Sequence, residues 1–193
     1  MNQTIAYYNQ NAREFCDVTR NADMGFCRNK FLHHLKLGAH ILDAGCGSGR
    51  DAKAFMDAGY VVTALDASTE ICKEAEKFLG QRVMCMSFEE MDFCQEFDGI
   101  WACASLLHIS KETIVQVLKR FRAALKENGI LYASFKYGQG ERREGERFFM
   151  DYQEAPLKEL MEECCFYIVE IFVSQDVRQG RNAQWWVNVL ARK

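Results

Sequence analysis

The sequence has little proline, no long apolar run and no cysteine arrangement typical of metal sites or disulfide frameworks. One proline among 193 residues, without a Pro- or Ser-rich linker, argues against two domains joined by an extended segment. The nine cysteines contain no Cys-x-x-Cys pair and no Cys/His ligand spacing, so we expect reduced thiols and no metal. No stretch reaches the ~20 apolar residues of a membrane span. These absences favour one α/β domain outside the membrane.

An excess of positive charge is also absent. Lys and Arg number 24 against 27 Asp and Glu, a formal net charge of −3. The chain as a whole therefore offers no electrostatic attraction to DNA or to a membrane surface. We expect a cytoplasmic protein with a small-molecule partner and with neither a membrane nor a nucleic acid as partner; no feature specifies an oligomeric state.

Short apolar runs alternate with helical patterns along the chain. The expected strands are residues 40–44, 60–65, 83–86, 97–104, 130–136, 166–173 and 184–190. The expected helices are residues 2–16, 24–36, 51–58, 68–79 with Ser68 as N-cap, 111–126 ended by Asn128-Gly129, and 153–163, while residues 137–147 are expected as a polar loop.

Helices between successive strands make the strands parallel, whereas the short Arg-rich connection before the last strand makes that strand antiparallel. The sequence therefore predicts a single α/β domain over residues 1–193. It has a seven-stranded, mostly parallel sheet with an antiparallel last strand and helices on both faces. Residues 1–36 are helical and residues 37–193 form the α/β core.

The most informative motif is a buried strand that ends in an acid and a glycine turn, Ile41-Leu42-Asp43-Ala44-Gly45-Cys46-Gly47-Ser48-Gly49-Arg50-Asp51. Dinucleotide sites need G-x-G-x-x-G, but here the third glycine comes one residue early and Arg50 takes the last place. The motif also lacks the Lys of a phosphate loop. A tight turn without a phosphate site suits S-adenosylmethionine, whose ammonium group Asp43 is placed to bind.

A second acid, Asp66, stands at the end of the next strand, about twenty residues beyond the glycine turn. A carboxylate there can accept both ribose hydroxyls, although an Asp at a strand end also serves as a helix cap or turn residue. Ligands of open α/β sheets bind at the carboxyl ends of the strands. Ser87-Phe88 and Ala102-Cys103 should therefore complete the pocket.

The runs ILDAGCGSGRDAKAF, VTALDAS, FDGIWACASLLHI and LKENGILYASFKYG resemble the class I S-adenosylmethionine-dependent methyltransferases, near the tellurite-resistance and small-molecule branches. The resemblance covers nearly the whole chain and implies their Rossmann-like sandwich and a transferase activity. It implies that Asp43, Gly45 and Gly47 carry the methionine end, Asp66 the ribose, Ser87 and Phe88 the adenine edge, and Ala102 a backbone contact. Cys46, Arg50 and Ala67, within the same motifs, complete the predicted cofactor site. Where the family often has an acid after the third strand, this chain has Ser87.

Two further residues are candidates near the transferred methyl group. His108, just past the fourth strand, could deprotonate or orient an acceptor, or it could cap or pack the following loop. Tyr8 could close over the cofactor or lie on the buried face of a helix; the resemblance favours a lid formed by residues 1–36.

Two segments near the C-terminal end of the sequence are rich in arginine. The first contains Arg142, Arg143 and Arg147, and the second contains Arg178 and Arg181. Charges in a loop are usually solvated, but Arg142, Arg147, Arg178 and Arg181 could instead bind an anionic acceptor through bidentate hydrogen bonds. Both segments reach one cavity only if the fifth and seventh strands are neighbours. Trp185 and Trp186, by contrast, are expected to be packing residues.

Methyl transfer from a sulfonium is an in-line displacement that positioning alone accelerates, so the lack of a catalytic triad is no objection. We therefore predict an S-adenosylmethionine-dependent methyltransferase acting on a small, anionic molecule. The alternatives are a methyltransferase acting on RNA or protein, and a non-catalytic module that binds S-adenosylmethionine. Ala102-Cys103-Ala104-Ser105 stands where base-amino methyltransferases carry Asn-Pro-Pro-Tyr, which argues against a base as acceptor.

Overall fold

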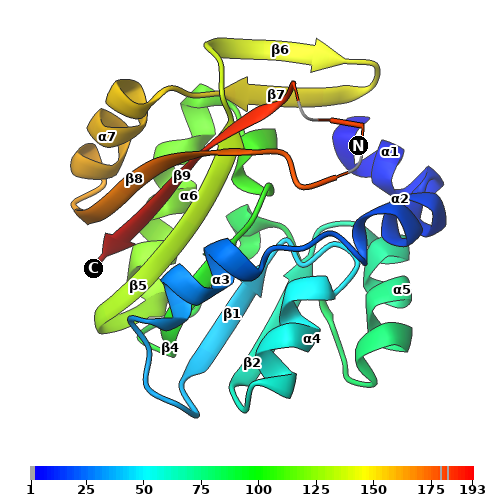
Figure 1. Ribbon diagram of the computed structural model, residues 1–193, viewed down its shortest axis with the longest axis horizontal. Coiled ribbons are helices and arrows are strands. Elements are labelled where there is room, and N and C mark those ends of the chain that lie inside the picture. Colours follow the sequence, from blue (N-terminus) through cyan, green and yellow to red (C-terminus); the bar gives the residue numbers. More distant parts are fainter. Residues whose placement is uncertain (1–2, 179, 182) are drawn as a thin grey trace.

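A seven-stranded sheet runs through the centre of the molecule in the computed structural model, which describes residues 3–178, 180–181 and 183–193 (Figure 1). The strand order is β3-β2-β1-β4-β5-β9-β8. The strands are β1 (His40–Ala44), β2 (Val61–Asp66), β3 (Met84–Cys85), β4 (Phe97–Ala102), β5 (Leu125–Lys136), β8 (Tyr167–Gln175) and β9 (Trp185–Arg192). Only β9 runs antiparallel to its neighbours β5 and β8, so the predicted sheet is confirmed.

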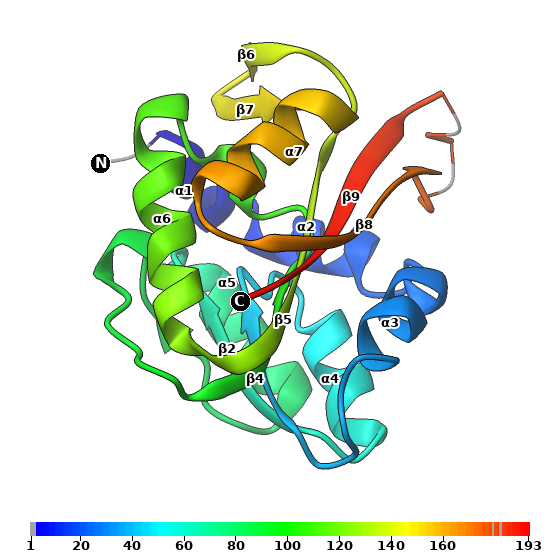
Figure 2. The same cartoon turned by 90° about the vertical axis from the view of Figure 1, so that its left-hand side faces the viewer.

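Helices cover both faces of this sheet. The helices are α3 (Gly25–Leu32), α4 (Arg50–Asp57), α5 (Thr69–Leu79), α6 (Lys111–Ala124) and α7 (Glu154–Glu163), with 3-10 turns η1 (Phe88–Glu90) and η2 (Leu106–His108). Figure 2 shows α6 and α7 on one side of the strands and α3 and α4 on the other. Phe31, Phe55 and Trp101 pack together on the α3–α4 side, so this face has an aromatic core. None of the described helices is long and apolar enough to cross a membrane.

The helix that follows β2 begins and ends where the sequence predicts. The Ser68 Oγ accepts the Ile71 N–H at 3.2 Å, and Gly80 ends α5 with a φ of 68°. The Ser68 hydroxyl also donates to Asn9 Oδ1 at 2.7 Å. This contact ties the N-terminal segment to the start of α5.

The N-terminal segment forms two helices, α1 (Gln3–Gln10) and α2 (Ala12–Thr19), instead of the single helix predicted over residues 2–16. Asn11 breaks the helix with φ −112° and ψ 16°. Its side chain donates to the Tyr7 carbonyl at 2.8 Å, and this carbonyl also accepts the Asn11 N–H at 3.0 Å. Both helices pack against α5 (Figure 1).

The predicted polar loop at 137–147 is wrong. The segment contains β6 (Gly140–Glu144), which pairs with β7 (Arg147–Asp151) in a separate two-stranded sheet. The turn uses Gly145 at φ 60°, and β7 buries Phe149 and Met150. The polar composition of β6 concealed a strand that is held by pairing with its neighbour.

The junction of α6 and β5 also differs from the prediction. The helix ends at Ala124, β5 begins directly at Leu125, and Asn128 adopts φ 63° within the strand. The pairing of β4 with β5 shifts between Phe97 and Gly99. The Asn-Gly pair therefore shapes a bulge and does not stop the helix.

Candidate active site

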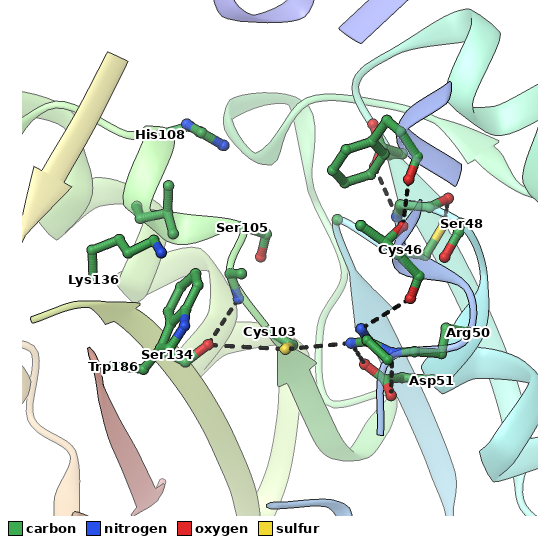
Figure 3. Close-up of a pocket in the computed structure, with 18 of the residues that line it drawn as sticks. Cys46, Ser48, Arg50, Asp51, Cys103, Ser105, His108, Ser134, Lys136 and Trp186 are labelled. Carbon is green, nitrogen blue, oxygen red and sulfur yellow. Dashed lines mark hydrogen bonds and ion pairs between the residues drawn. The ribbon is translucent and has the colours of Figure 1, made fainter. Parts of the chain in front are cut away.

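A cavity opens at the carboxyl ends of the central strands, between the N-terminal helices and the β8–β9 end of the sheet (Figure 3). Figure 3 shows Arg50 and Asp51 on one side and His108, Lys136 and Trp186 on the other. We call the first side the glycine-loop half and the second the cationic half. The sequence-predicted residues that line the cavity are Tyr8, Asp43, Gly45, Cys46, Gly47, Arg50, Asp66, Ala67, Ser87, Phe88, His108, Arg147, Arg178 and Arg181.

Two predicted residues do not line the cavity. Ala102 is fully buried in β4. Arg142 lies on the hairpin, where its Nε donates to Asp151 at 2.5 Å and its Nη1 lies 3.3 Å from Glu144. Its charge is already used by two carboxylates of the same hairpin.

The glycine turn after β1 folds tightly against β2. Gly45 and Gly47 have φ values of 78° and 54°, which favour glycine. The N–H groups of Gly45 and Cys46 both donate to the Leu65 carbonyl at 2.9 Å. A side chain at Gly45 would overlap Ser105, so the backbone here lies as close to the opposite wall as it can. The turn thus has no room for a side chain at Gly45.

Asp66 projects from the end of β2 into this half of the cavity. Its carboxylate accepts the Gly47 N–H at 3.1 Å and the Ser68 N–H at 2.9 Å, which fixes its orientation. Burial raises the pKa of Asp66, while these backbone donors lower it. The side chain is held in place with lone pairs left for a ligand.

The wall beyond Asp66 begins at Ser87, whose N–H donates to the Glu90 carboxylate at 2.8 Å. Ser87 and Glu90 form a capping box around η1, which presents Phe88 to the cavity. Sequence reasoning missed Glu89, which also lines the cavity. An acid after the third strand is thus present, two residues later than the family pattern suggests.

Asp43 lies at the base of the glycine-loop half and is 2% exposed. Its Oδ2 accepts the Ala52 N–H at 3.0 Å, in the first turn of α4. Burial, followed by the neighbouring Asp51 charge, raises the pKa of Asp43 well above its usual value. This carboxyl group therefore favours a cationic partner.

His108 and Tyr8 join the N-terminal helix to the opposite wall. The His108 Nδ1 lies 2.7 Å from the Phe148 carbonyl, so this nitrogen carries the proton. In neutral His108 the Nε2 then accepts the Tyr8 hydroxyl proton at 2.9 Å. Burial lowers the pKa of His108 to about 4 and raises that of Tyr8 to about 12. Both groups are neutral near pH 7.

This pair predicts a pH-dependent loss of stability. Because the pKa of His108 is lowered from 6.5 to about 4, the unfolded chain binds the extra proton first, and the stabilisation present above pH 6.5 is lost as the pH falls through 4. The free energy of unfolding lost through His108 is expected to be on the order of 3 kcal/mol. Urea unfolding of wild type and His108→Gln between pH 7 and 4 measures it: the variant should lose less stability over this interval. Parallel curves would contradict the prediction.

The cationic half is organised around Asp176, which is 6% exposed. The Asp176 carboxylate accepts hydrogen bonds from three side chains. They come from Arg178 at 2.5 Å, from the Trp186 Nε1 at 3.2 Å and from the Lys136 Nζ at 3.3 Å. Burial alone would raise the pKa of Asp176, but the Arg178 hydrogen bonds lower it far below its usual range. The Lys136 Nζ also lies 4.2 Å from the centre of the Trp186 ring.

Sequence reasoning missed Lys136 and Asp176 and treated Trp186 as a packing residue, although all three line this half. They meet because β5 pairs with β9, where Lys136 is opposite Trp186. No spacing along the chain indicates this contact.

Arg147 completes this wall from the hairpin. Its guanidinium lies 4.8 Å from the Tyr7 ring centre and 5.2 Å from that of Phe149, and its Nη2 is 3.3 Å from Glu144. Its Nε is buried without a hydrogen-bond partner among the described residues. A donor of this kind calls for an acceptor that a ligand can supply.

The described residues contain no group of three or more His, Cys, Asp or Glu side chains arranged to hold a metal ion.

Comparison with known proteins gives a partial match to one family. Residues 41–129 match the family described as a methyltransferase domain. The ubiquinone biosynthesis O-methyltransferase of Actinobacillus pleuropneumoniae is 29% identical over 108 residues, which cover 50% of this chain and 45% of that protein. The chain spans about half the length of the curated relatives it matches.

Solved structures extend the likeness over the whole fold. The 1,6-didemethyltoxoflavin-N1-methyltransferase of Burkholderia thailandensis, with bound 1,6-didemethyltoxoflavin and S-adenosylhomocysteine, has a TM-score of 0.83 at 24% identity, covering 99% of this chain and 87% of that chain. The cyclase SpnF has a TM-score of 0.79 at 16% identity, covering 100% and 96%. These likenesses concern the fold, which hosts more than one chemistry. Over residues 41–129 this chain thus matches a methyltransferase domain, and its overall fold is that of S-adenosylmethionine-dependent methyltransferases of known structure. The tellurite-resistance branch stays a prediction.

Proposed function

We propose that this protein transfers the methyl group of S-adenosylmethionine to a small, anionic acceptor. The observation that carries the proposal is one cavity whose first half is a glycine turn with two acids and whose second half gathers Lys136, Arg178 and Trp186. The structural neighbour from Burkholderia thailandensis, named for a small-molecule acceptor and solved with S-adenosylhomocysteine, supports it. The methyltransferase name of the curated relative supports the reaction.

The cofactor occupies the glycine-loop half in this proposal. Asp66 accepts the ribose hydroxyls, Phe88 packs against the adenine, and Gly45 and Gly47 allow the backbone to approach the methionine portion. Residues 1–36 act as a lid, with the Tyr8 contact to His108 closing it. The methyl carbon would then face the cationic half.

The acceptor must supply its own nucleophile. The His108 Nε2 is occupied by Tyr8, and a pKa of about 4 makes this imidazole a weak base. Lys136 forms an ion pair with Asp176, whose charge opposes the lowering of the Lys136 pKa by burial. In this proposal His108 and Tyr8 therefore orient the acceptor and do not deprotonate it. The acceptor is an acidic compound that ionises without an enzyme base, and the in-line transfer follows from positioning.

Charge-neutral replacements in the cationic half test the acceptor class. We expect Arg178→Met and Arg147→Met each to lower kcat/KM for the acceptor by about 10- to 100-fold, because one charge-assisted hydrogen bond is lost. Cofactor affinity should be unchanged. Arg143→Met is the matched control, since Arg143 lies on the same hairpin, contacts Gln3 and does not line the cavity. Unchanged acceptor kinetics in both variants would exclude an anionic acceptor bound here.

Turnover itself is tested by S-adenosylhomocysteine release. The purified protein is incubated with S-adenosylmethionine and a panel of acidic ring compounds, and then with RNA and protein extracts. Release with small acids supports the proposal. Release only with macromolecules favours the first alternative, and tight cofactor binding without release from any acceptor favours a non-catalytic module.

A further inference from the structure

Trp186 lines the cationic half of the cavity, and its indole ring is held at two points (Figure 3). Its Nε1 donates to the buried Asp176 carboxylate at 3.2 Å, and the Lys136 Nζ lies 4.2 Å from the centre of the ring. In the part of the chain that the structure describes, no other aromatic ring is paired with Trp186, whereas the buried Trp101 stacks on Tyr132 at 3.9 Å. A fixed aromatic surface is therefore available to a ligand in this half.

Lys136 supports this ring, and its donors are used within the protein. An ammonium group has three N–H donors. They meet the Asp176 carboxylate at 3.3 Å, the side-chain oxygen of Gln184 and the Trp186 ring. Lys136 is opposite Trp186 in the antiparallel pair of β5 and β9, so the register of the sheet fixes their contact. The negative charge of an acceptor is therefore left to the arginines of this half.

Asp176 joins the ring to one of these arginines. Its Oδ2 accepts the Trp186 Nε1 and the Arg178 Nη2, and its Oδ1 accepts the Arg178 Nε at 2.9 Å and the Arg178 backbone N–H at 3.0 Å. Arg178 thus uses the Nε–Nη2 edge of its guanidinium for Asp176, and the Nη1 side lies outside this pair. One buried carboxylate therefore fixes an aromatic ring and a guanidinium relative to each other.

The proposed reaction restricts the acceptor further, because the site offers it no effective base. Burial lowers the pKa of His108 to about 4, and its Nε2 already accepts the Tyr8 hydroxyl. The attacking oxygen, nitrogen or sulfur must therefore arrive ionised. An O–H, N–H or S–H group conjugated with an aromatic ring meets this condition, because the ring spreads the negative charge and makes the group more acidic. Such a ring is also flat, as stacking on an indole requires.

We propose that the acceptor is a planar, conjugated anion that packs against the Trp186 ring, and that Asp176 is the positioning residue that holds this ring beside Arg178. The inference rests on the proposed function for the methyl transfer and adds the shape of the acceptor to its charge. The ionised atom of the ring forms the new bond to the methyl carbon as the bond to the sulfonium breaks, and S-adenosylhomocysteine leaves as a neutral thioether. A saturated anion of similar size should bind less tightly, because it cannot stack.

Two probes that share a carboxylate and differ in the ring test the inference. Calorimetry titrates 2-naphthoate and decahydro-2-naphthoate into the protein saturated with S-adenosylhomocysteine. Wild type should bind 2-naphthoate about 3- to 10-fold more tightly, and the ratio should fall to about one in Trp186→Leu. Trp185→Leu is the matched control, because Trp185 is the neighbouring residue of β9, is 45% exposed and does not line the cavity. It should keep the wild-type ratio.

Further variants separate the ring from the charge and test the positioning role. Arg178→Met should weaken the binding of both probes and leave their ratio unchanged. Asp176→Ala should lower the ratio, whereas Asp176→Asn keeps an oxygen for the indole N–H and should retain part of it. Asp176→Ala should also shift the tryptophan emission, and the shift should be absent when Trp186→Leu is already present.

Wild-type affinity for S-adenosylhomocysteine shows that a variant is folded, and Trp186→Phe, which should keep part of the ratio, serves if Trp186→Leu does not fold. Equal binding of the two probes by wild type, binding of neither, or an unchanged ratio in Trp186→Leu overturns the inference, while the proposed function stands. If wild type binds no S-adenosylhomocysteine, the proposed function fails and the inference with it.

Discussion

Replacing Asp66 with alanine is expected to weaken the binding of S-adenosylmethionine and S-adenosylhomocysteine by about 100-fold or more. In the proposed complex this carboxylate accepts two ribose hydroxyls, and hydrogen bonds to a charged group contribute about 1.5–3 kcal/mol each. The Gly47 and Ser68 N–H groups orient the carboxylate before the ligand arrives. Little of the loss should be recovered by rearrangement. Isothermal titration with the two ligands measures the change directly.

The control for this experiment is Asp57→Ala. Asp57 ends α4 and is exposed, so its removal changes the net charge equally without touching the cavity. Asp66→Asn keeps an acceptor oxygen and should fall between wild type and Asp66→Ala. Wild-type affinity in a folded Asp66→Ala protein would contradict the ribose assignment. Tight binding of NAD to wild type would contradict the cofactor assignment as a whole.

Replacing Gly45 with alanine is expected to cost about 2–5 kcal/mol of the free energy of unfolding and to weaken cofactor binding. A left-handed conformation costs an L-residue about 1–2 kcal/mol, and an overpacked contact about 1–3 kcal/mol. Gly45 has both problems, since its φ is 78° and the added methyl group would overlap Ser105. The Ser105 hydroxyl is held by the Ala44 carbonyl at 2.7 Å, so this neighbour cannot easily withdraw. Urea unfolding gives the change.

Gly38→Ala separates the two causes. Gly38 has nearly the same φ, 79°, but a methyl group there would meet nothing within 4 Å. Gly38→Ala should lower the free energy of unfolding only by the cost of the left-handed backbone conformation, about 1–2 kcal/mol. Equal losses in the two variants would mean that the contact with Ser105 contributes nothing.

Much of the fold could be predicted because its elements carry local patterns. The apolar run of β1 and the Ser68 cap are both local, and each is present where expected. The errors arose where a contact distant in sequence overrode the local pattern. Residues 140–144 are polar yet form β6 because β7 pairs with them, and Asn128 is absorbed into a bulge of β5.

The candidate site divides in the same way. The glycine-loop half was predicted from motifs because its residues lie on two successive strand ends, whose parallel pairing brings Asp43 and Asp66 to one edge of the sheet. The cationic half was predicted only in part, because the sequence indicated its arginines and His108 but not the residues that they meet. Lys136, Asp176 and Trp186 come from three segments, and Arg142, which resembles its neighbours in sequence, is neutralised by Asp151.

The sequence by itself determined the class of fold, the glycine turn and the two acids at strand ends. These features depend on backbone conformation and hydrophobic periodicity, which a few neighbouring residues decide. Only the tertiary structure decided which charges remain available to a ligand. Charge pairing depends on distances across the sheet. The antiparallel β5–β9 pair brings Lys136 to Trp186, and the packing of α3 beside α4 gives Asp51 a second arginine.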